Sequence, residues 1–175
     1  MKLTQRGELS KLSKEQLLDY IGVMSKNWWT LQNNWMANTE KKYGSDVALE
    51  FDCLVCAKYG TVELHRFKKL FNLGDDMEAL KKWLIFSFLM NGEDFEIEFV
   101  EDTPKRLYWR CTRCPIQLRR RKEGLPELPC KAVWVSDADT FGKAANPKIK
   151  SVHYYAPPDP HTEDNWCGCI WEMED

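Results

Sequence analysis

Residues 95–115, FEIEFVEDTPKRLYWRCTRCP, mark the point at which the periodicity of the chain changes. Apolar residues occupy every second position over 95–99 and again over 107–111, which is the period of a half-buried strand. The intervening Asp102-Thr-Pro-Lys has the composition of a turn. This pattern predicts an antiparallel hairpin whose second strand passes into a short helix at Cys111-Thr-Arg-Cys114-Pro115.

The residues before the hairpin predict helices. Ser13 and Gln16 fit a capping box, and apolar residues then recur at alternating spacings of four and three as far as Trp35. This first helix is expected to end at Gly44. A second helix is expected over residues 45–71, bent or broken at Gly60.

A third helix is expected after Asp76, ending at Asn91-Gly92. Beyond the hairpin, the sequence predicts a helix over 115–123, another that starts at Asp137 or Asp139 and ends at Asn146, and strands over 148–155 and 166–173. Helices first and antiparallel strands later indicate an α+β fold. We expect a single domain over 1–175, in which a helical N-terminal half (1–92) packs on a small antiparallel sheet with short helices from the cysteine-rich half (93–175).

The charge balance and the short apolar stretches of the chain argue against two classes of protein, nucleic-acid binders and membrane proteins. The chain has 175 residues, with 25 basic and 27 acidic side chains and a formal net charge of -2. This balance argues against a dedicated nucleic-acid binder. The longest apolar stretch, 83–90, is far shorter than the roughly 20 residues of a membrane span, and residues 1–10 have no apolar signal core. We therefore expect a cytoplasmic protein with no membrane partner.

Seven cysteines are the unusual feature of this composition, because reduced thiols in the cytoplasm act as metal ligands, reactive groups or core residues. Cys53 and Cys56 lie within a predicted helix, where packing as small apolar residues explains them. The other five lie at the ends of predicted elements: Cys111, Cys114, Cys130, Cys167 and Cys169. Thiols from three separate segments are typical of a tetrahedral zinc site, although scattered core cysteines would give the same composition.

Cys114 has a further feature, since it precedes Pro115 at a predicted helix N-terminus. The helix dipole and free N–H groups there favour a thiolate, which is both a metal ligand and a nucleophile. His161, in a proline-rich loop before Cys167, is an alternative ligand or base. The basic run 119–122 suits a helix C-terminus, and anion binding is a second interpretation of it.

These segments also carry a resemblance. Residues 109–117 (WRCTRCPIQ), 119–131 (RRRKEGLPELPCK), 146–149 (NPKI), 157–161 (PPDPH) and 166–167 (WC) resemble a family of uncharacterised prokaryotic cytosolic proteins with a domain of unknown function. That family is similar to L-2-amino-thiazoline-4-carboxylate hydrolases and, more distantly, to vinyl-reductase-type domains. The resemblance covers most of the chain and is most specific in the last 70 residues.

The resemblance implies that Cys114, Cys130 and Cys167 are the metal-binding or active-site thiols. Relatives often carry another cysteine where this chain has Ala156, so Cys111 or Cys169 must complete a four-thiolate site; otherwise a position stays open for water.

Two functions follow from these residues. The first is a cysteine-ligated metal protein, with zinc as the expected metal and an iron–sulfur cluster as the alternative. The second is a hydrolase of a small cyclic amide or amidine, in which metal-bound water or the Cys114 thiolate attacks. In that second reading Arg110, Arg113 or Arg119 pairs with the carboxylate of a small anionic substrate. The sequence predicts neither the substrate nor the oligomeric state.

Overall fold

The computed structural model describes residues 4–88 and 95–174, and for 135 and 136 it describes the backbone only. The elements follow in the order α1 (Gln5–Leu9), α2 (Lys14–Tyr43), α3 (Ser45–Phe71), α4 (Met77–Phe86), β1 (Glu96–Asp102), β2 (Arg106–Arg113), α5 (Pro115–Lys122), α6 (Lys131–Ala145), β3 (Ile149–Tyr155) and β4 (Cys167–Met173).

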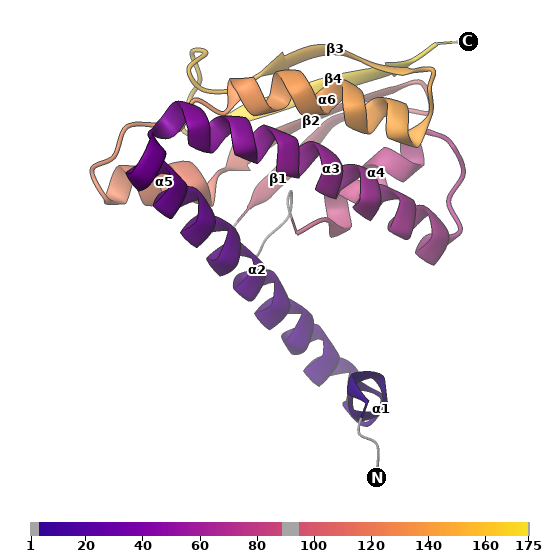
Figure 1. Cartoon of the computed structure of the whole chain (residues 1–175). Coiled ribbons are helices and arrows are strands. Elements are labelled where there is room, and N and C mark those ends of the chain that lie inside the picture. Colours follow the sequence, from indigo (N-terminus) through magenta and orange to yellow (C-terminus); the bar gives the residue numbers. More distant parts are fainter. Residues whose placement is uncertain (1–3, 89–94, 175) are drawn as a thin grey trace.

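The first long helix begins and ends where the sequence predicts. The Ser13 side chain accepts a hydrogen bond from the backbone N–H of Gln16, whose side chain accepts from the N–H of Ser13 in return. Gly44, with φ of 93°, turns the chain directly into α3. Figure 1 shows α2 running from this turn away from the rest of the molecule, with α1 at its far end.

Helix α3 is continuous through Gly60, so the predicted break there is wrong. A Cβ at residue 60 would lie 2.4 Å from Cε1 of Phe141 on α6. The glycine therefore permits close helix packing, and the contact with α6 compensates for its low helix propensity. Helix α4 ends at Phe86, earlier than predicted. The stop predicted at Asn91-Gly92 lies outside the described residues.

The four strands form an antiparallel sheet with the order β1-β2-β4-β3. The hairpin predicted from residues 95–111 is present as β1 and β2. Helix α6 begins at Lys131, so a start at Asp137 or Asp139 is wrong. The N–H of Lys131 donates to the carbonyl of Pro157 at 3.0 Å, and α6 then packs against both α3 and β3. These long-range contacts outweigh the local capping signal of the aspartates.

Figure 1 shows α3 and α6 side by side over the sheet, with α4 and α5 toward its two ends. The core lies between these helices and the sheet and contains four fully buried indoles, those of Trp83, Trp109, Trp166 and Trp171. The molecule thus has the α+β fold that the sequence predicts. No helix among the described residues is long and apolar enough to cross a membrane.

Candidate functional site

Strand pairing brings the first thiols together. Cys111, near the end of β2, lies opposite Cys167 at the start of β4, and the N–H of Trp166 donates to the carbonyl of Cys111 at 2.9 Å. Cys114 follows three residues after Cys111 and is the N-cap residue of α5, where Pro115 begins the helix. One corner of the sheet therefore carries Cys111, Cys114 and Cys167.

Cys130 reaches the same corner through a buried amide. The Gln117 side chain on α5 is 1% exposed. Its Oε1 accepts from the N–H of Leu128 and its Nε2 donates to the carbonyl of Leu128, both at 2.9 Å. The same Nε2 lies 3.3 Å from Sγ of Cys130 and donates to it. Gln117 thus holds the loop before α6 against α5 and places Cys130 near Cys114.

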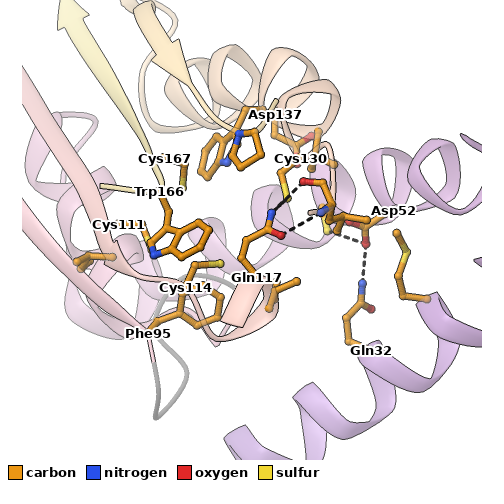
Figure 2. Close-up of a pocket in the computed structure, with 18 of the residues that line it drawn as sticks. Gln32, Asp52, Phe95, Cys111, Cys114, Gln117, Cys130, Asp137, Trp166 and Cys167 are labelled. Atoms are coloured by element: carbon orange, nitrogen blue, oxygen red, sulfur yellow. Dashed lines mark hydrogen bonds between the residues drawn. The ribbon is translucent and has the colours of Figure 1, made fainter. Parts of the chain in front are cut away.

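Cys111, Cys114, Cys130 and Cys167 all line one cavity of about 140 Å³, together with Cys56 of α3. Figure 2 shows Cys111, Cys114 and Cys167 grouped around Trp166, with Cys130 between them and Asp52. Most of the remaining wall is aromatic: Trp29, Phe95, Trp109, Trp134, Phe141 and Trp166. Four of the five thiols that the sequence singles out, from three separate segments, therefore face a common space.

Cys169 and His161 lie outside this group. Cys169 is fully buried two residues further along β4, opposite Trp109, and its thiol donates to Oγ of Ser151 at 3.7 Å. His161 stacks on Trp166 at 4.8 Å between ring centroids, and its Nε2 lies 3.0 Å from Oε2 of Glu127. Neither residue lines the cavity.

Burial and mutual contacts raise the pKa of the Cys111 and Cys114 thiols. The hydrogen bond to the Cys111 thiol and burial raise the pKa of Cys114, and the N–H groups of Gln117 and Ile116 lower it by less. The Cys114 thiol lowers the pKa of Cys111, but the Cys167 thiol and burial raise it more. The helix N-terminus therefore does not produce a free thiolate at Cys114, contrary to the expectation from its position, because burial and the neighbouring thiol prevail.

Burial raises the pKa of Cys130 to about 12, with a smaller contribution from Cys114. A bound cation reverses this balance, since a coordinating thiol is deprotonated. Within residues 4–88 and 95–174, no three His, Cys, Asp or Glu side chains form a group that can hold a metal ion as they stand. A metal would therefore require the sulfurs to move closer together.

The side of the cavity that faces α2 and α3 carries carboxylates. Oδ1 of Asp52 accepts hydrogen bonds from Nε2 of Gln32 at 2.6 Å and from the Cys56 thiol at 3.5 Å. Burial raises the pKa of Asp52, and these two hydrogen bonds lower it by less. Asp137 on α6 is 2% exposed and lines the same cavity. Neither carboxylate nor Gln32 belongs to a sequence motif that pointed to a site.

Among the described residues that line the cavity there is no lysine, arginine or histidine. Two of the three arginines expected to hold an anionic substrate are paired elsewhere, Arg110 with Glu98 at 2.7 Å and Arg119 with Glu123 at 2.9 Å. Arg113 does not line the cavity either. An anionic substrate held by these arginines would therefore bind outside the cavity that the thiols line.

Comparison with known proteins gives a family but no activity. The family described as DUF6125, a family of unknown function, matches residues 10–174. No match was found among curated proteins, and none among solved structures.

Proposed function

The chain belongs to the DUF6125 family, whose function is unknown, and we propose from the geometry of the cavity that it is a cysteine-ligated metal-binding protein. The ligands are Cys111, Cys114, Cys130 and Cys167, and the metal is zinc. The observation that carries the proposal is that these four thiols, from β2, the α5 N-terminus, the α6 N-terminus and β4, line one cavity.

The ligand set follows from contacts within this group. The thiols of Cys114 and Cys167 both lie close enough to Cys111 to change its pKa. Cys130 follows a loop and is held through the Gln117 amide rather than by strand pairing. It is therefore the ligand that can approach the others with the least disturbance of the sheet.

The chemistry of the group favours zinc. Four thiolates form a closed tetrahedral site of the kind that structural zinc occupies, with Zn–S distances of about 2.3 Å. Zinc would convert buried thiols into thiolates and tie the end of β2 to β4 and to the loop before α6. Its binding free energy would then add to the free energy of folding.

Elemental analysis and a visible spectrum of protein purified under reducing conditions test the proposal. We expect stoichiometric zinc in a colourless protein, and a lower melting temperature after chelation. Replacement of zinc by Co²⁺ should give intense sulfur-to-cobalt charge-transfer bands, whose strength reports the number of thiolates.

The matched variants are Cys130→Ser and Cys169→Ser. The first removes a proposed ligand and should abolish stoichiometric binding, whereas the second changes a buried thiol outside the cavity and should retain the metal. A protein that binds neither zinc nor Co²⁺ tightly, or a Cys130→Ser variant that keeps its zinc and its cobalt bands, would overturn the proposal. An iron–sulfur cluster in the same thiols would give a brown protein with visible absorption and would replace zinc as the cofactor.

The hydrolase of a cyclic amide or amidine stays a prediction and receives no separate support from the cavity. Its thiolate form needs a deprotonated Cys114, whose pKa is raised. Its metal form needs an open coordination position, which would arise if Cys130 did not bind the ion.

A further inference from the structure

The part of the cavity on the Asp52 side of Cys130 (Figure 2) has carboxylates that the proposed metal site does not use. Asp52 and Asp137 reach it from α3 and α6, and both lie close enough to the Cys56 thiol to raise its pKa. Aromatic rings form most of the remaining wall. We propose that this part of the cavity binds a small organic amine, about the size of one aromatic ring, as its ammonium form. The binding site does not rest on the metal.

The size of the ligand follows from the cavity volume. The whole cavity, with its thiol side included, has about 140 Å³, which sets an upper limit close to the roughly 150 Å³ of an apolar protein cavity that takes up benzene. A single ring with a short substituent fits such a space, and a fused two-ring system does not.

The charge of the ligand follows from the ionisable side chains in the wall. Asp137 is 2% exposed, and Asp52 accepts hydrogen bonds from the Gln32 amide and the Cys56 thiol, neither of which carries a positive charge. Among the described residues that line the cavity no side chain is cationic, so none of them balances the charge of Asp52. A buried carboxylate is stabilised by an opposite charge that is held within hydrogen-bonding distance, and an ammonium group would supply it.

The aromatic wall of the cavity also favours a positively charged ligand. Trp29 and Phe95 lie 5.1 Å apart between ring centroids, and Trp109 and Trp134 lie 5.2 Å apart. Indole and phenyl faces attract cations, and proteins recognise ammonium ligands with such aromatic walls. An anion would meet both the π faces and the carboxylates unfavourably.

Unpartnered indole groups indicate that the ligand also carries a hydrogen-bond acceptor. The Nε1 atoms of Trp29, Trp109 and Trp166 are buried and have no hydrogen-bond partner among the described residues, and all three side chains line the cavity. Trp109 is fully buried. A buried N–H without a partner lowers stability, so an acceptor atom on the ligand would be favourable here.

Binding of three single-ring probes to the purified protein, followed by tryptophan fluorescence and by melting temperature, tests the proposal. The probes are benzylamine, benzyl alcohol and benzoate. We expect benzylammonium to bind about tenfold or more tightly than benzyl alcohol, because it adds a charge-assisted hydrogen bond, and benzoate to bind least. If an indole N–H donates to the ligand, 4-(aminomethyl)pyridine or its 3-isomer should bind more tightly than benzylamine, because the pyridine nitrogen can accept that hydrogen bond. 1-Naphthylmethylamine should bind more weakly, because it exceeds the cavity.

Asp52→Asn should lower the affinity for benzylamine by about tenfold and leave that for benzyl alcohol unchanged. Asp46→Asn, an exposed position in the first turn of the same helix, is the matched control and should bind like the unmodified protein. Equal affinities for the amine and the alcohol, tighter binding of benzoate, or an Asp52→Asn variant with full amine affinity would each overturn the proposal. Because the carboxylates require no metal, amine binding should persist after chelation. A protein that proves to bind no metal should therefore still bind the amine.

Discussion

Two of the carboxylates on helix α3, the buried Glu63 and the half-buried Asp52, have different surroundings. Glu63 lies in a packed region, where Tyr59 Oη donates to its Oε1 at 2.8 Å, and Trp83 Nε1 at 3.0 Å and the Ser87 hydroxyl both donate to its Oε2. Asp52, about three turns earlier, borders the cavity, and Gln32 and Cys56 both donate to its Oδ1. Glu63 is satisfied by the fold, whereas Asp52 faces a space that a ligand can fill.

Burial raises the pKa of both carboxyl groups, so an elevated pKa does not distinguish a structural group from a functional one. The number of donors and the presence of an adjoining cavity do distinguish them. A carboxylate enclosed by donors stabilises one conformation, whereas a carboxylate at a cavity wall costs stability until a partner arrives. Amide substitutions at the two positions should therefore have opposite effects.

The largest effect is expected for Glu63→Gln. The amide must turn its nitrogen toward the Tyr59 hydroxyl, which then has to accept instead of donate, and the three charge-assisted hydrogen bonds to the carboxylate become weaker neutral ones. The free energy of unfolding should fall by about 3 kcal/mol, measured by urea denaturation. A loss below about 0.5 kcal/mol, the range of ordinary surface substitutions, would show that the network is not structural.

Gly60→Ala tests the packing that lies between the two carboxylates. The added methyl would overlap the Phe141 ring, which also lines the cavity, and should cost about 2 kcal/mol in the free energy of unfolding. The same substitution in a Phe141→Leu background should cost less, because the ring is no longer present. Equal costs in the two backgrounds would mean that Gly60 and Phe141 do not interact.

Asp52→Asn should stabilise the protein by about 1 kcal/mol at neutral pH, because the amide keeps Oδ1 as an acceptor and removes a half-buried charge. The raised pKa means that the folded state binds the proton more tightly than the unfolded chain does. The contribution of Asp52 to stability therefore falls as pH rises from its ordinary value through the folded-state pKa.

Denaturation curves between about pH 4 and pH 8 measure this change, and the variant should lack the decline that Asp52 causes. If Asp52→Asn destabilises the protein as Glu63→Gln does, the contrast between the two carboxylates is wrong.

The smallest effect concerns a carboxylate near the surface. A hydrogen bond with His161 lowers the pKa of Glu127, and although burial lowers the pKa of His161, its contacts with Glu127 and the Thr162 carbonyl raise it more. The stabilisation from Glu127 is lost as pH falls through its lowered pKa. The stabilisation from His161 is lost as pH rises through its raised pKa.

The pair should therefore contribute most between the ordinary values, near about pH 5.5. Glu127→Gln should cost about 0.5 kcal/mol more there than above about pH 8, where the 3.5 Å ion pair of Glu127 with Arg121 is what remains. Thermal unfolding at the two pH values measures the difference, and a cost independent of pH would show that the ion pair contributes nothing.

Signals carried by neighbouring residues predicted much of the fold. The Ser13 capping box, the Gly44 stop and the alternation in the hairpin depend on contacts within a few residues, and each of them is present in the structure. The position of the thiols at element ends also follows from local patterns. Cys114 is found at the N-cap of α5 as predicted, whereas Cys130 directly precedes α6, whose start the sequence placed at Asp137 or Asp139.

Tertiary packing decides which residues that are far apart in the chain come into contact. The start of α6, the continuity of α3 at Gly60 and the association of Asp52 with the thiol cavity all depend on how α3 and α6 pack. The pairing of β2 with β4 places Cys111 opposite Cys167 and leaves Cys169 beside Trp109. Local patterns mark candidate residues because helix caps and strand alternation are short-range effects. They do not predict which candidate residues share a site, because distant segments come together only when they bury their apolar faces against one another.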